Sequence, residues 1–173
     1  KLGNGILPLM MRAKQSCIYP PMLKNKIEEI IMSDEIIEKE SMRELLEKAT
    51  HNTSKLNKVI EKILERKENG NKKIIFCTFR AEIDYLENKL SNRDMIIEKF
   101  DGRTKEKDRI EILENNNIDI LILQIQTGSE GLNLWGFREI HILDPWHNIN
   151  LLEQVIGRVI RNKSHHHLNA KNR

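Results

Sequence analysis

The chain has 173 residues, a net charge of +3 at neutral pH, 32% charged residues and 5% aromatic residues. This length suffices for one domain with a sizeable core, and the mildly basic charge permits a nucleic-acid partner without requiring one. The scarcity of aromatic side chains argues against an extended stacking platform for single-stranded bases. Two cysteines are too few for a disulfide framework and no apolar run is long enough to span a membrane. We therefore expect an intracellular protein without a membrane partner.

Residues 1–52 are predicted to form a helical lead-in. Two prolines at positions 20 and 21 end any helix before them, and residues 24–50 alternate charged with aliphatic residues, as amphipathic helices do. A further helix begins near Ser54, which can cap it, and ends at Gly70. Its apolar stripe consists of Leu56, Val59, Ile60, Ile63 and Leu64. We expect the lead-in to dock on the domain that residues 53–173 form.

From residue 71 onward, short apolar runs alternate with helical patterns. The predicted strands are Lys73–Phe79, Met95–Phe100, Ile118–Ile125 and Glu139–Leu143. One predicted helix spans residues 81–90, with Ile83, Leu86 and Leu90 facing inward. The next is capped by Thr104 and runs to about Glu114, with Ile110 and Leu113 facing inward. Continuous apolar strands alternating with helices predict an α/β fold with a doubly wound parallel sheet flanked by helices.

Four loops follow the predicted strands, and ligands of open α/β sheets bind at the carboxyl ends of strands. These loops are residues 78–80, 101–104, 126–133 and 144–147. The third loop contains Gly128 and Gly131, which let a ligand approach the backbone, and Thr127 adds a hydroxyl. A plain structural turn is an alternative interpretation of this loop.

The segment Leu151–Arg161 is predicted to be an amphipathic helix with an unusual polar side. Gln154, Arg158 and Arg161 fall on one stripe, and the opposite side carries Leu152, Val155, Ile156 and Val159. Gly157 is disfavoured in a helix by about 1 kcal/mol relative to Ala, which suggests that something packs closely there. A solvated basic face is the alternative interpretation of the stripe.

The chain lacks the usual elements that hold a nucleoside triphosphate. No G-x-x-x-x-G-K-[ST] phosphate loop occurs, and the acidic pair Asp34-Glu35 lies in the lead-in rather than after an apolar strand. Three consecutive histidines at 165–167 cannot all face one ion, so we predict no metal site. The arginines of residues 151–161 therefore make sense as half of a site that another part of the protein completes.

The ordered motifs resemble the second RecA-like lobe of superfamily-two helicases, in particular the Swi/Snf-type DNA translocases. The matching segments are residues 54–56, 74–79, 101–104 with Arg109, 127–134, 142–148 and 154–161. The ending Gly157–His165 also resembles the viral branch of the family, which includes poxvirus nucleoside triphosphatase I and early-transcription ATPases. We accordingly expect a first lobe upstream of this sequence and further chain beyond its end.

The resemblance implies roles for individual residues. Arg158 and Arg161 would act as arginine fingers on the γ-phosphate of ATP, with Gln154 orienting them, so these three are the catalytic candidates. The nucleotide contacts at the interface between the lobes would be Gly128, Glu130, Gly131, Arg158 and Arg161. The phosphates of the DNA backbone would contact Thr78, Arg80, Gly102 and Thr127. ATP with Mg²⁺ would be bound mainly by the first lobe.

The function implied by the resemblance is an ATP-dependent translocase on double-stranded DNA, to which this chain contributes one lobe that is inactive alone. A strand-unwinding RNA or DNA helicase and a nucleic-acid-binding module without catalysis are alternatives. The expected partners are the first lobe, DNA and, in a transcription role, the transcription machinery. The expected location is the nucleus of a eukaryotic cell, or the host cytoplasm or virion of a virus.

Overall fold

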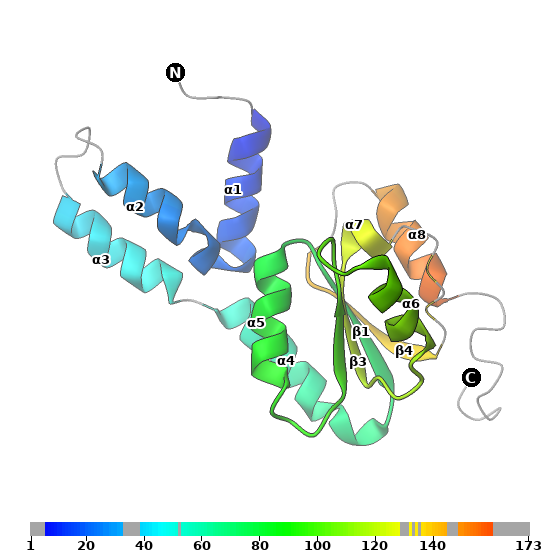
Figure 1. Cartoon of the computed structure of the whole chain (residues 1–173). Coiled ribbons are helices and arrows are strands. Elements are labelled where there is room, and N and C mark those ends of the chain that lie inside the picture. Colours follow the sequence, from blue (N-terminus) through cyan, green and yellow to red (C-terminus); the bar gives the residue numbers. More distant parts are fainter. Residues whose placement is uncertain are drawn as a thin grey trace. The chain divides into compact units, whose positions relative to one another are not determined.

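The computed structural model describes residues 6–32, 39–51, 53–128, 132, 134, 136–144 and 149–160 (Figure 1). The contacts between its residues divide the chain into two compact units, Lys1–Lys58 and Val59–Arg173. Within the described residues, no helix is long and apolar enough to cross a membrane.

The described residues of the first unit are mainly helical. It contains α1 (Ile6–Ile18), the 3-10 turn η1 (Pro20–Leu23), α2 (Lys24–Met32) and α3 (Lys39–Thr50). Helix α1 ends just before the two prolines, as expected because proline cannot continue a helix. The turn η1 contacts all three helices, and α2 packs against α3. The docking of this unit on the second one stays a prediction.

Helix α4 (Ser54–Glu65) begins in the first unit and ends in the second. Its stripe is confirmed, because Leu56, Ile60 and Ile63 are buried. The predicted cap is displaced by one residue: the carbonyl of Thr53 accepts the first helical hydrogen bond, from the Asn57 N–H at 2.9 Å. A 3-10 turn, η2 (Lys67–Asn69), follows, and Gly70 ends it in the left-handed conformation with φ +65°.

The second unit is built on a parallel sheet of four strands. They are β1 (Lys72–Cys77), β2 (Ile97–Phe100), β3 (Ile120–Gln124) and β4 (Phe137–Ile142), in the order β2-β3-β1-β4. Every neighbouring pair is parallel, with Ile74 of β1 opposite Leu121 of β3 and Ile140 of β4. The predicted doubly wound sheet is therefore confirmed. Strand β3 is shorter than expected because Ile125 already opens the short helix α7 (Ile125–Gly128).

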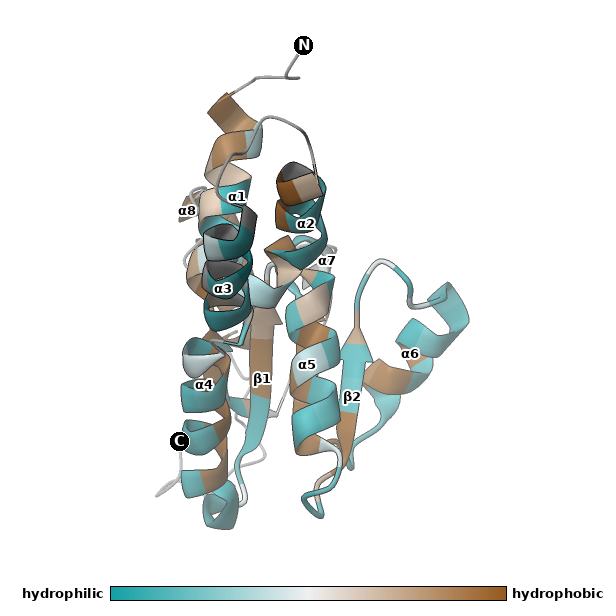
Figure 2. Cartoon of the chain, turned by 90° about the vertical axis from the view of Figure 1, so that its left-hand side faces the viewer, coloured by the Kyte–Doolittle hydropathy of each residue, from teal (hydrophilic) through white to brown (hydrophobic). Residues whose placement is uncertain are grey.

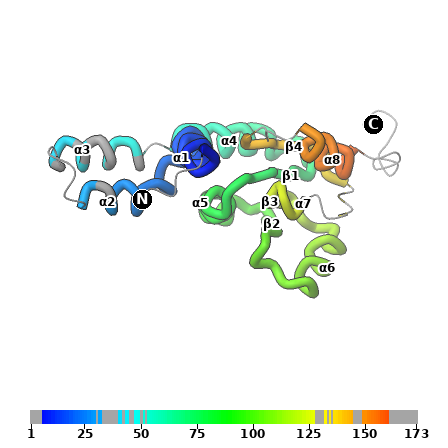
Figure 3. Tube along the Cα trace, turned by 90° about the horizontal axis from the view of Figure 1, so that it is seen from above, coloured from blue at the N-terminus to red at the C-terminus, as the bar shows by residue number. Residues whose placement is uncertain are grey.

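Helices cover both faces of the sheet. Seen from above, α5 (Arg80–Leu90) lies on one face, and α6 (Glu106–Glu114) and α8 (Ile149–Val159) lie on the other (Figure 3). As predicted, Ile83, Leu86 and Leu90 of α5 are buried. In Figure 2, α5 and α6 each carry both teal and brown residues, as amphipathic helices beside a buried sheet should. The core between the sheet, α6 and α8 includes Ile74, Phe76, Phe100, Leu121, Leu123, Val155 and Val159.

Two details of α6 differ from the sequence prediction. The helix begins at Glu106 with Lys105 at the capping position, where no side chain caps it. Thr104 does not cap this helix, because its Oγ1 instead accepts a hydrogen bond from the backbone N–H of Asp101 at 3.0 Å. Ile110, predicted to face inward, is 56% exposed. Leu113 packs against the core as predicted, together with Ile112.

Candidate functional site

The four parallel strands end at one edge of the sheet, and the predicted site residues follow these ends. The turn after β1 is fixed by a buried carboxylate in the first turn of α5. Glu82 Oε2 accepts the backbone N–H groups of Thr78 at 2.8 Å and of Phe79 at 2.6 Å. A carboxylate at a helix N-terminus is also favoured by the helix dipole. Thr78 is buried, and its carbonyl accepts a hydrogen bond from Gln124 Nε2 of β3 at 3.4 Å.

The turn after β2 is closed by hydrogen bonds that Asp101 accepts from the two residues Arg103 and Thr104. The Thr104 N–H donates to the Asp101 carbonyl at 3.0 Å, and the Asp101 carboxylate accepts the Arg103 N–H at 2.7 Å. Arg109 supports the turn from α6, because its Nε donates to the Thr104 carbonyl at 2.9 Å and its guanidinium lies 5.0 Å from the centre of the Phe100 ring. Burial alone would raise the pKa of Asp101. Hydrogen bonds from Arg103 and the charges of Arg103 and Arg80 outweigh it, so that this pKa lies below its ordinary value.

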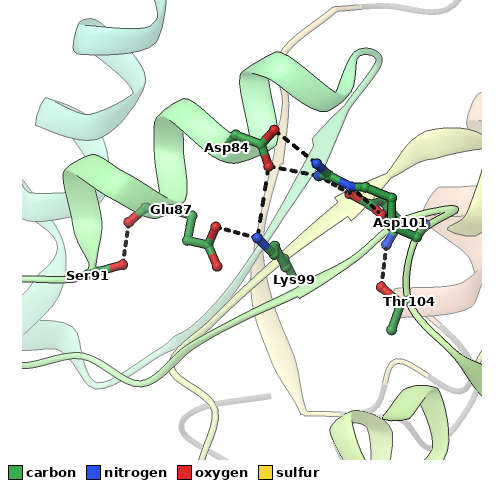
Figure 4. A network of polar contacts seen from close by, with 7 residues as sticks. Asp84, Glu87, Ser91, Lys99, Asp101 and Thr104 are labelled. Carbon is green, nitrogen blue, oxygen red and sulfur yellow. Dashed lines mark hydrogen bonds and ion pairs between the residues drawn. The ribbon is translucent and has the colours of Figure 1, made fainter. Parts of the chain in front are cut away.

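The side chain of Arg103 donates hydrogen bonds to the carboxylates of Asp84 and Asp101, which are both labelled in Figure 4. Its Nη1 and Nη2 donate to the two oxygens of Asp84 on α5, at 3.1 and 2.7 Å. Its Nε donates to the Asp101 carboxylate, 3.0 Å from Oδ2. The hydrogen bonds from Arg103 to Asp84 and Asp101 raise its pKa above the ordinary value. Lys99 extends the network, because its Nζ lies 3.9 Å from Asp84 Oδ1 and 2.5 Å from Glu87 Oε2.

Arg80 and Gly102 lie against each other, although they follow different strands. A Cβ atom built on Gly102 would lie 3.0 Å from Nη2 of Arg80, which is tighter than ordinary contact. Both residues are exposed. The turns after β1 and β2 therefore bring together two of the four residues predicted to contact DNA phosphates. An exposed guanidinium over a glycine turn is a suitable donor arrangement for a phosphate oxygen.

The remaining predicted contacts are placed less completely. Thr127 lies in α7, directly after β3, and is buried. Because β3 is the neighbour of β1, Thr127 and Thr78 follow adjacent strands. Gly128 is the last residue of α7. Glu130 and Gly131 lie outside the described residues. No group of three His, Cys, Asp or Glu residues able to hold a metal ion occurs in the described part of the chain.

Helix α8 confirms the apolar side of the helix that was predicted for residues 151–161. Val155 and Val159 are buried, whereas Gln154 is exposed and Arg158 is half-buried. Because they are four residues apart, Gln154 and Arg158 lie on the same side of the helix. Arg161 lies outside the described residues.

Gly157 departs from the expectation of close packing. Apart from its chain neighbours and the backbone of its own helix, no heavy atom of the described structure lies within 4 Å of a Cβ built on this residue, and it is exposed. The prediction is therefore wrong for contacts within the described chain.

Two residues of this edge, Glu82 and Asp84, were not predicted from the sequence. Glu82 had a recognisable signal, because a glutamate at the third position of a helix commonly accepts hydrogen bonds from the preceding backbone. Asp84 had no such sequence signal, because its partner Arg103 lies in the turn after β2 and only the fold brings the two residues together.

A second polar cluster joins β1 and β4 on the neighbouring strands. Glu139 is paired in register with Lys73, their side chains are 4.0 Å apart, and Glu139 also accepts a hydrogen bond from Asn69. His141 Nε2 lies 3.6 Å from Glu139 Oε2. Burial lowers the pKa of His141 below its ordinary value, although the Glu139 carboxylate acts in the opposite direction.

Comparison with known proteins gives a consistent result. Residues 54–163 match the family model described as the helicase conserved C-terminal domain. The DNA repair protein RAD5 of Debaryomyces hansenii is 32% identical over 124 residues, which is 65% of this chain. RAD5B of Arabidopsis thaliana is 33% identical over 118 residues, or 66% of this chain. The chain spans about one tenth of the length of these relatives.

Solved structures show the same fold. The C-terminal part of the Fun30 ATPase domain has a TM-score of 0.56 at 24% identity, over 83% of this chain and 57% of that one. The Hef helicase domain of Pyrococcus furiosus has a TM-score of 0.54 at 18% identity, over 82% of this chain and 32% of that one. The predicted RecA-like fold is thus confirmed. The two sequence relatives are cellular DNA repair proteins and lend no support to the resemblance with the viral branch or to a role in transcription.

Proposed function

Because the chain belongs to the family of helicase conserved C-terminal domains, we propose that it supplies the second lobe of an ATP-dependent DNA translocase. The observation that carries the proposal is the meeting of Arg80 and Gly102 at the sheet edge where all four strands end. This arrangement offers a phosphate an exposed cation and a closely approachable backbone. The family's relatives that act in DNA repair support DNA as the substrate.

The proposed DNA contacts recognise the backbone and carry no sequence information. Arg80 neutralises one phosphate, and the absence of a side chain at Gly102 leaves room for its guanidinium. Thr78 and Thr127 are buried, so within this proposal they line the base of the contact. Contacts of this kind fix the position of a protein on DNA without reading bases.

The proposed role in ATP hydrolysis belongs to α8. Negative charge spreads over the phosphoryl oxygens in the transition state, and a planar guanidinium can meet two of them. Arg158 is fixed by a helix whose opposite side is packed into the core, and Gln154 is on the same side. Arg161 is proposed as the second finger, and Gly128, Glu130 and Gly131 as contacts to the nucleotide. ATP and Mg²⁺ would be bound mainly by the first lobe.

The test uses the full-length protein with Arg158→Ala. We expect DNA-stimulated ATP hydrolysis to fall by about 10³-fold or more, as for loss of other arginine fingers, while the affinity for duplex DNA changes less than about two-fold, an energy below 0.5 kcal/mol. Glu153→Ala, an exposed neighbour on the same helix, is the matched control and should keep both activities. Normal turnover by Arg158→Ala would contradict the assignment.

A further inference from the structure

Three arginines lie at or beside the turns after β1 and β2, and their surroundings differ. The guanidinium of Arg103 is paired with carboxylates, because its Nε and both Nη atoms donate hydrogen bonds to Asp84 or Asp101. Among the described residues, Arg80 makes no hydrogen bond or ion pair of the kind that holds Arg103, although its charge acts on the Asp101 carboxylate, and it is exposed. Arg109 is bound to the carbonyl of Thr104 and lies on Phe100. Arg80 is thus the guanidinium of this group that is available to a phosphate.

The position of Arg80 depends on the turn beneath it. Its Nη2 lies against Gly102, which is the residue between the two anchors of the turn, Asp101 and Arg103. Asp101 is held from within the turn, by its own hydrogen bonds to Arg103 and Thr104. Asp84 is the anchor from outside, because it reaches Arg103 from α5 with two hydrogen bonds.

We propose that Asp84 is a positioning residue for DNA binding, which acts through Arg103 to hold the turn at Gly102 beneath Arg80. Helix α5 begins at Arg80 itself and carries Asp84 one turn later. The same helix therefore presents the guanidinium and fixes the surface on which it lies. The inference rests on the proposed function, since the contact that it regulates is the one to DNA phosphates.

A simple charge effect predicts the opposite sign, which makes the inference testable. Asp84 is an acidic residue beside a phosphate-binding edge, so its removal should strengthen DNA binding if only electrostatic repulsion mattered. If Asp84 acts as an anchor, its removal should weaken DNA binding instead. Its side chain is 47% exposed, so the substitution does not leave a cavity in the core.

The experiment measures, in the full-length protein, the duplex DNA concentration that half-saturates ATP hydrolysis. We expect Arg80→Ala to raise it by about ten-fold, the loss of one charge-assisted hydrogen bond. Asp84→Asn and Arg103→Lys should each raise this DNA concentration by about three-fold to ten-fold, because neither substitution preserves the bidentate hydrogen bonds between residues 84 and 103. For Asp84→Asn and Arg103→Lys, hydrolysis at saturating DNA and the KM for ATP should stay within about two-fold, which separates positioning from unfolding. Glu87→Gln, which removes a carboxylate from the same helix and network, is the matched control and should cause no rise.

A double variant decides whether Asp84 works through Arg80. If it does, Arg80→Ala with Asp84→Asn should bind DNA no more weakly than Arg80→Ala alone, because coupled residues do not add. Additive effects, or unchanged or tighter DNA binding in Asp84→Asn, would overturn the inference while leaving the proposed function intact. Wild-type hydrolysis that DNA does not stimulate would remove the proposed function, and the inference with it.

Discussion

At the scale of single residues, the fold changes what several side chains can do. Arg80 and Arg103 look equivalent in the sequence, since each is an arginine in a loop after a strand. Their surroundings separate them, because Arg103 meets Asp84 and Asp101 whereas Arg80 lies exposed over Gly102. Sequence patterns could identify the loops, because loops follow strands. They could not identify the pairing, because it depends on how two turns approach across the sheet.

His141 gives a prediction for the dependence of stability on pH. Its pKa in the folded chain is lowered by burial, below the ordinary value of about 6.5. As the pH falls through that value, the unfolded chain binds a proton before the folded chain does. The contribution of a neutral His141 to the free energy of unfolding is therefore fully present above the ordinary pKa and is lost below it.

We expect the wild-type chain to lose up to about 1.4 kcal/mol of stability per pH unit below 6.5 through this residue, until the folded-state pKa is reached. His141→Gln cannot bind the proton and should remove this part of the slope. The measurement is urea unfolding between pH 7.5 and 5.5, with His51→Gln, an exposed histidine, as the control. Parallel curves for wild type and His141→Gln would show that His141 does not titrate in this way.

At the scale of elements, hydrophobic periodicity predicted which segments form helices and strands, whereas local hydrogen bonds set where these elements begin and end. The apolar runs located all four strands and the helices α4, α5 and α8, because burial of alternate or helical faces dominates their formation. The start of α6 was misplaced. Thr104 has a second use as an acceptor for the Asp101 N–H, and this bond closes the turn rather than the helix. The helix therefore starts one residue later than predicted, and Ile110 is exposed instead of facing the core.

Gly157 in α8 gives a prediction at this scale. Nothing described lies near it, so Gly157→Ala should stabilise the chain by about 0.5–1 kcal/mol through helix propensity alone. In the full-length protein, we expect the first lobe to approach this side of α8 and to use the open space that glycine leaves. The same substitution should then slow DNA-stimulated ATP hydrolysis.

Thermal or urea unfolding of the chain and the hydrolysis rate of the full-length protein measure these two effects separately. Glu153→Ala adds an alanine to the same helix at an exposed position, and should leave the hydrolysis rate unchanged. Wild-type turnover by a stabilised Gly157→Ala variant would show that the first lobe does not approach this residue.

At the scale of the whole molecule, the proposed site would be shared between two lobes, so that this lobe alone would not complete it. The carboxyl edge of the sheet supplies donors for phosphate, and the sequence contains no phosphate loop to hold a triphosphate. The net charge of +3 is small, so any DNA affinity of the chain alone must come from local contacts rather than from its overall charge. We therefore expect no measurable ATP hydrolysis from these residues alone, with weak DNA binding.

The dependence of DNA affinity on salt concentration reports how many phosphates the protein neutralises. Each phosphate that a side chain neutralises releases condensed cations and adds about −0.9 to the slope of log affinity against log salt concentration. Arg80→Ala should therefore make the slope shallower by about 0.9, because it removes one such contact. Arg93 lies exposed in the turn before β2, at the opposite edge of the sheet, so Arg93→Ala is the matched control.

Fluorescence anisotropy with a short labelled duplex, at several salt concentrations, measures both slopes. A protein that bound DNA only through its diffuse positive charge would lose the same amount of slope in either variant, since each removes one arginine. A local contact at the carboxyl edge requires the loss to be confined to Arg80→Ala. Equal slopes for the two variants would therefore place the DNA elsewhere on the chain, because the effect would then depend on charge number and not on the position of the guanidinium over Gly102.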